Sequence, residues 1–173
     1  MAKTMAQALA ARIRYQIKDG EEVLKAAGAG TDNDRTCAVL GSPLDVLSVR
    51  GNVSDVALTN HLWLLDAAAS GAVRADLGSL DLPRPTSIEA AVAFLGPRDS
   101  DDAALAAARL NQVNETIARA VEGLSDEELE RPVEVTFKGQ KPLRDLLFII
   151  IEHGALHIGQ AWGTLKGAGY AGR

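Results

Sequence analysis

Apolar residues recur every three or four positions along four stretches of the chain, which is the spacing of amphipathic helices. The first stretch covers about 4–27 and the second about 54–70. The third covers about 100–122, and the fourth begins at Pro142 and runs to Gly167. Helix-capping residues or a proline mark the start of the last three stretches, and a glycine lies near each end. The pattern predicts an all-α protein with four helices.

Long connections separate the first three of these helices, at about 28–53 and 71–99. Connections of this length relax the antiparallel arrangement that short loops impose on consecutive helices. No internal repeat or low-complexity segment divides the chain. We therefore expect a single four-helix domain over residues 1–173.

The connection at 124–141 carries its own local signals. Ser125 and Glu128 have the spacing of a capping box, which predicts a helical turn. Residues 133–137 alternate in the manner of a short strand, and 138–140 are typical of a turn.

All three histidines lie on predicted helices. His153 and His157 are four residues apart, so their side chains leave the same face with Cβ atoms ~5–6 Å apart. That spacing lets both imidazoles bind one metal ion. His61, on the second helix, shares a face with leucines and is expected to point inward as well. Because buried imidazoles need partners for their nitrogens, one shared metal ion at His61, His153 and His157 is the simplest interpretation.

Three other polar residues, Gln160, Asn60 and Asp66, lie near the histidines. Gln160 lies one turn beyond His157, where it could support a metal ligand by a hydrogen bond or join two helices. Asn60 and Asp66 lie off the face of His61 and are expected to be solvated.

Several other kinds of metal site are excluded by the sequence. Gly154 follows His153, so the HExxH arrangement of zinc proteases is absent, and no Glu-x-x-His pair favours a di-iron bundle. The one cysteine, Cys37, excludes a zinc site with two or more thiolates. What remains is one mononuclear ion with three imidazoles and an open position.

Composition and charge restrict the class of protein to which this site can belong. The chain has a net charge of −5 and no cluster of Lys or Arg, so nothing indicates nucleic-acid binding. Its longest apolar run, at 146–151, is too short to cross a membrane. The N-terminal stretch is interrupted by Arg12 and Arg14 and is expected to be a helix, not a signal peptide. With a single cysteine, these features predict a soluble cytoplasmic domain.

His61 on the second helix, His153-x-x-x-His157 on the fourth and Gly159-Gln160 just after resemble the DinB/YfiT-like superfamily of metalloenzymes. The resemblance covers nearly the whole chain and implies a four-helix bundle with an up-down-down-up arrangement. It also implies that the three histidines bind a divalent metal ion (zinc, nickel or iron) and that the protein forms a homodimer.

The resemblance also implies a chemistry. Similar families include S-transferases that use a low-molecular-weight thiol and mycothiol-dependent maleylpyruvate isomerases. This chain has Ile158 where many members have arginine. It also keeps three histidines where the isomerase branch has one carboxylate, which argues against the isomerase.

Two functions therefore stay open. The first is a metal-dependent transferase or hydrolase acting on a small molecule, with a low-molecular-weight thiol as co-substrate. The second is a non-catalytic stress-response protein that binds a metal or a small ligand. A general base near the metal would distinguish them, but Glu152 points roughly 100° away from the histidine face.

Overall fold

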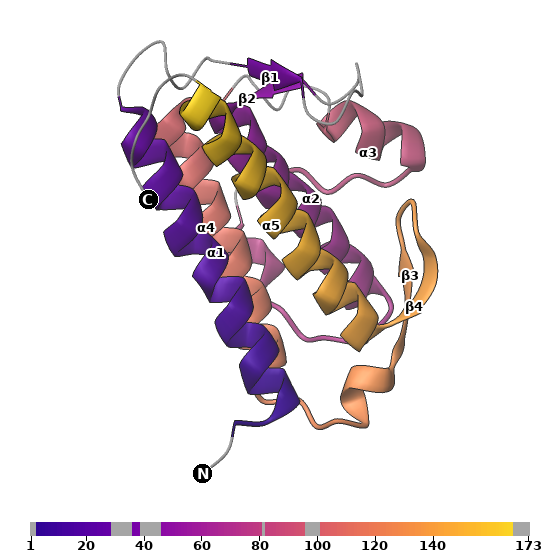
Figure 1. Cartoon of the computed structure of the whole chain (residues 1–173). Helices are drawn as coiled ribbons and strands as arrows, with labels where there is room; N and C mark the ends of the chain where they lie inside the picture. The colour runs from indigo at the N-terminus through magenta and orange to yellow at the C-terminus, as the bar shows by residue number, and fades with distance from the viewer. Residues whose placement is uncertain (1–2, 29–35, 39–45, 81, 96–100, 168–173) are drawn as a thin grey trace.

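The computed structural model describes residues 3–28, 36–38, 46–80, 82–95 and 101–167. Over these residues the structure is an all-α bundle, as predicted (Figure 1). Its long helices are α1 (Met5–Ala27), α2 (Val49–Ala69), α4 (Ala103–Val121) and α5 (Leu143–Gly167).

Shorter elements occupy the connections. The helix α3 (Ile88–Leu95) lies in the connection at 71–99, where no helix was predicted. Strands β1 (Thr36–Ala38) and β2 (Val46–Ser48) form one antiparallel pair, and β3 (Pro132–Val135) and β4 (Gly139–Pro142) form another. Two 3-10 turns, η1 (Leu77–Ser79) and η3 (Glu128–Glu130), complete the described elements.

The four long helices run up, down, down and up. Arg14 on α1 reaches Glu115 and Glu122 near the end of α4, whereas Gly20 packs against Leu110 nearer its start, so these two helices are antiparallel. Figure 1 shows α5 running in the direction of α1, and α2 running in the direction of α4. Each of α1 and α2 packs against both α4 and α5. This is the arrangement that the resemblance implied.

The helix α2 is buried on almost every side. It packs against α4 and α5 within the bundle, and against α3 and β3 on its other side. Nearly all residues from Val49 to Leu64 are buried, including several polar ones. A helix surrounded in this way has no single inward face.

The start of α2 differs from the prediction. The hydroxyl of Ser48 accepts a hydrogen bond from the Gly51 N–H at 2.9 Å and caps the helix, which therefore begins at Val49. Ser54 and Asp55, which we expected at the first turn, lie one turn further inside, and both are buried.

The connection before α5 follows its local signals. Ser125 and Glu128 each bond the other's backbone N–H through their side chains, which is the predicted capping box. The predicted strand-like piece overlaps β3, which pairs with β4 to form a hairpin. Pro142 ends β4 and directly precedes the first residue of α5.

Among the helices that the structure describes, none is both long enough and apolar enough to cross a membrane.

Candidate metal site

A carboxylate and two imidazoles meet where α2 packs against α5. Oδ2 of Asp55 lies 3.1 Å from Nε2 of His153 and 3.1 Å from Nε2 of His157. The side chain of Asp55 is 2% exposed, that of His157 9% and that of His153 18%. One ligand atom from each residue lies within 4.8 Å of the others, so the three could hold one metal ion.

The two histidines reach Asp55 together because they stand one turn apart on α5. Their ring centroids are 4.5 Å apart, which matches the expectation for positions i and i+4 of a helix. Asp55 comes from a helix nearly a hundred residues earlier in the chain. The site therefore depends on how α2 and α5 pack.

A buried amide fixes the orientation of His157. Asn52, one turn before Asp55 on α2, donates from Nδ2 to the carbonyl of Ser48 at 2.9 Å. Its Oδ1 is thereby turned toward Nδ1 of His157, 3.0 Å away. Because an amide oxygen only accepts, Nδ1 carries the proton, and a neutral His157 presents the lone pair of Nε2 to Asp55.

The approach of Asp55 to the two histidines requires a cation between them. A lone pair on Nε2 facing a carboxylate oxygen is repulsive unless a proton or a metal ion stands between them. The same oxygen faces both histidines. Ligands that surround one zinc ion at 2.0–2.2 Å lie ~3.4 Å from one another, close to the separations found here. One carboxylate and two imidazoles also form a usual donor set for zinc, nickel or iron. The residues present therefore fit a divalent metal ion.

Trp63 holds the other side of His153. The indole and imidazole rings meet edge to face, with centroids 5.2 Å apart and planes at 74°. The indole N–H donates to the carbonyl of Thr136 beyond β3 at 3.4 Å. Asp66 in turn accepts from the backbone N–H and the hydroxyl of Thr136 at 2.7 and 3.0 Å. The hairpin is thus tied to α2 at the point where α2 supports His153.

The structure places His61 outside this group. Its ring is fully buried, but Nε2 lies 3.0 Å from the carbonyl of Pro83, and the ring faces Phe94 of α3 at 6.0 Å. His61 therefore joins α2 to the connection at 82–95, not to α5. Burial lowers the pKa of His61, and nearby Arg84 adds to this effect, against the hydrogen bond to Pro83. The structure does not bring the three predicted histidines together: Asp55, and not His61, lies beside His153 and His157.

Asn52 accepts the hydrogen bond from Nδ1 of His157, the kind of contact that the sequence suggests for Gln160. Gln160 is half-buried, and its carbonyl accepts from the hydroxyl of Thr164 at 3.0 Å. A supporting role for its side chain stays a prediction.

Sequence reasoning missed Asp55 and Asn52 because it placed both at or before a helix start. The signal that could have found them was Ser48, a suitable N-cap followed by valines at 49, 53 and 56 with helical spacing. A helix starting there puts Asn52 and Asp55 three residues apart on one buried face.

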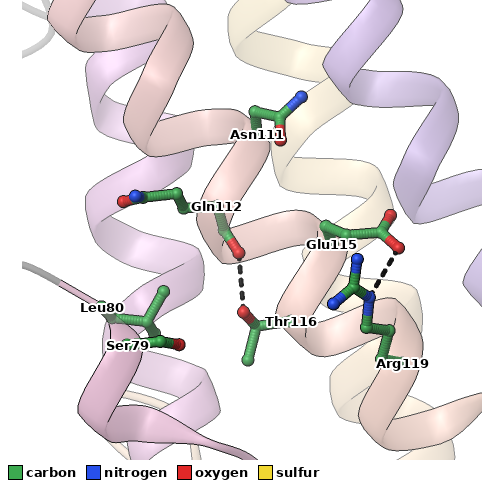
Figure 2. A pocket seen from close by; sticks show the side chains of 7 residues that line it. All are labelled: Ser79, Leu80, Asn111, Gln112, Glu115, Thr116 and Arg119. Atoms are coloured by element: carbon green, nitrogen blue, oxygen red, sulfur yellow. Dashed lines mark hydrogen bonds and ion pairs between the residues drawn. The ribbon is translucent and has the colours of Figure 1, made fainter.

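A groove of about 230 Å³ lies elsewhere, between η1 and the outer face of α4 (Figure 2). Two interactions at its wall lie within α4: the hydroxyl of Thr116 donates to the Gln112 carbonyl, and Glu115 pairs with Arg119. Glu115 also pairs with Arg14 of α1. The groove contains no histidine and is separate from the group around Asp55.

Comparison with known families agrees with the fold. Residues 45–161, more than half of the chain, match the DinB superfamily. The matched region contains Asp55, His153 and His157. The chain belongs to the DinB superfamily. No curated protein and no solved structure matches the chain.

Proposed function

We propose that the protein is a metal-dependent enzyme whose single divalent ion is bound by Asp55, His153 and His157. The observation that carries this proposal is the buried carboxylate oxygen 3.1 Å from two imidazole nitrogens. Zinc, nickel and iron all suit this set of ligands. Three protein ligands leave a coordination position for substrate, which is typical of catalytic sites.

Asn52 and Trp63 orient and cover the two histidines of this site. Asn52 keeps His157 in the tautomer that points Nε2 at Asp55. Trp63 covers one edge of His153, which is the most exposed of the three side chains. A substrate would therefore approach from the side of His153. A divalent ion bound here would lower the pKa of a thiol or of water.

We assign the chemistry to a small-molecule substrate and a low-molecular-weight thiol. Glu152 is exposed, on α5 next to His153, and provides no buried base. A thiol needs less help from a base than water does, because its pKa is closer to neutrality. This favours thiol-dependent S-transfer over hydrolysis.

Asp55 supports a second candidate, thiol-dependent isomerisation. The three histidines had argued against the isomerase branch, which has a carboxylate in place of one histidine. Since a carboxylate does stand beside His153 and His157, that argument no longer holds. A non-catalytic metal-binding protein is the alternative to both.

Metal titration tests the site. Zinc binding to the chelator-treated protein, measured by calorimetry, should show one ion per chain. Asp55→Asn keeps the size of the side chain but loses the charge, and should abolish measurable binding. His61→Gln is the matched control, since it changes a buried histidine on the same helix, and it should bind zinc as the unaltered protein does. Equal loss in both variants, or loss in His61→Gln alone, would contradict the site.

Activity distinguishes an enzyme from a binding protein. The zinc-loaded protein should consume a low-molecular-weight thiol in the presence of an electrophilic acceptor, and Asp55→Asn should not. Formation of a thioether product indicates S-transfer, whereas isomerisation of an unsaturated diacid without net thiol loss indicates the second candidate. Full metal occupancy with neither reaction would favour the non-catalytic alternative.

A further inference from the structure

A chain of buried amides crosses the bundle beside the metal-site residues. Asn60 of α2 donates to Oδ1 of Asn114 of α4 at 2.9 Å. Asn114 donates to Oε1 of Gln16 of α1, also at 2.9 Å. Gln16 then donates from Nε2 to the carbonyls of Ile150 and Ile151 of α5, at 3.1 Å each. One hydrogen-bonded chain thus joins all four long helices.

Gln16 occupies a notch on α5 that is left by the missing side chain of Gly154. A Cβ atom added at Gly154 would lie 2.2–2.7 Å from the three amide atoms of Gln16, which is too close for any contact. Gly154 directly follows His153 and precedes His157 by three residues. The side chain of Gln16 therefore presses against α5 between the two metal ligands.

Burying an amide in a core costs free energy, because its polar atoms lose their hydrogen bonds to water. Leucine or methionine would pack there without any polar group to satisfy. A hydrogen-bonded amide has a different effect. Because hydrogen bonds are directional, its donors fix the neighbouring helix both along its axis and in its rotation about that axis. The carbonyls that Gln16 holds belong to the turn of α5 just before His153. Rotation of α5 there would carry both imidazoles away from Asp55.

We propose that Gln16 is a positioning residue of the metal site, which acts by fixing α5 so that His153 and His157 face Asp55. Neither Gln16 nor Asn114 touches the three ligands in the hydrogen bonds described. The inference rests on the proposed function, because it concerns the affinity of the same site for metal.

Gln16→Met tests the role of the hydrogen bonds. Methionine has the length of glutamine and still fills the notch, but it donates nothing to Ile150 or Ile151. Asn114 keeps an acceptor in this variant, the carbonyl of Ile13 at 3.3 Å. Zinc affinity should fall about 10-fold, the lower end of the range for lost support of a metal ligand. The absorption bands of the cobalt-substituted protein should also shift, since they report ligand geometry.

Two glycine variants provide a matched pair. Gly154→Ala would displace Gln16 and should weaken zinc binding at least as much as Gln16→Met. Gly20→Ala adds a methyl group in a similarly tight contact, 2.4 Å from Leu110, but at the interface of α1 with α4. It should leave zinc affinity and the cobalt spectrum unchanged. Thermal unfolding of the metal-free proteins measures the stability of each variant.

The outcomes separate the two proposals. If the unaltered protein binds no zinc, the proposed function fails. If it binds zinc and Gln16→Met binds equally well with the same cobalt spectrum, the positioning role is wrong. A loss of affinity that merely follows the loss of stability, and is shared by Gly20→Ala, would also overturn it.

Discussion

The role of the Asp55 carboxylate depends on where this residue lies along its helix. At a helix start, a carboxylate caps backbone N–H groups and stays in water. Seven residues after the cap and surrounded by other helices, it is buried and must meet positive charge. Its carboxylate meets two imidazoles, whose nitrogens can carry a proton or bind a metal ion.

At the same scale, Asn52 should prove important for metal binding. Asn52→Ala removes the acceptor that orients His157, so zinc affinity should fall by ~10–100-fold. Calorimetric titration measures the change. Asn60→Ala removes the far end of the amide chain that runs through Asn114 to Gln16, and should lower zinc affinity less than Asn52→Ala does. An unchanged affinity in Asn52→Ala would mean that α5 alone orients the ring.

His61 should make stability depend on pH. Burial lowers the pKa of His61 in the folded chain, so the unfolded chain takes up a proton as pH falls through about 6.5, before the folded chain does. The unfolded state then binds more protons, and the free energy of unfolding decreases as pH falls below that value.

Urea unfolding at pH 7.5 and 5.5, with a chelator present, measures this dependence. His61→Gln keeps a donor for the Pro83 carbonyl but does not titrate, so its loss of stability at pH 5.5 should be smaller. Identical losses in both proteins would assign the dependence to groups other than His61.

At the scale of elements, the hairpin of β3 and β4 carries local strain. Phe137 at its tip has a φ of 67°, in the left-handed region, and its side chain is 52% exposed. Left-handed backbone costs a residue with a Cβ atom roughly 1 kcal/mol. The neighbouring Thr136 keeps the turn in this conformation, because its backbone N–H and its hydroxyl both donate to Asp66. Burial raises the pKa of Asp66, an effect that these hydrogen bonds oppose.

Phe137→Gly and Phe137→Ala separate the backbone from the side chain. Both remove the aromatic ring, but only glycine adopts this φ without cost. The glycine variant should therefore be more stable than the alanine variant by about 1 kcal/mol in urea unfolding. An alanine variant of equal or greater stability would show that the turn relaxes to another conformation.

The burial of α2 explains why His61 was misplaced. A helix with one apolar face points its inward residues at one partner, whereas α2 meets α4, α5, α3 and β3 around its circumference. Positions 55 and 61 lie roughly 120° apart on such a helix. Both are buried, but against different neighbours. Asn60, expected in solvent, is buried for the same reason.

At the scale of the whole molecule, a bound ion would join α2 to α5 and thereby stabilise the bundle. Zinc at about 100 times its dissociation constant should add roughly 2.7 kcal/mol to the free energy of unfolding. The melting temperature should therefore be higher in zinc than in chelator, while Asp55→Asn melts at the same temperature in both. A zinc-dependent shift that persists in Asp55→Asn would place the ion elsewhere.

The homodimer implied by the family resemblance stays a prediction at this scale. Sedimentation of the zinc-loaded chain measures it directly.

The sequence was enough to predict the four long helices, because helical periodicity, caps and glycine stops are local. It also determined that His153 and His157 share a face, since helix geometry fixes neighbours four residues apart. The third residue of the site depends on tertiary packing. Which side of α2 meets α5 depends on the packing of segments far apart in the chain, and that packing turned Asp55 toward the histidines and His61 toward Pro83.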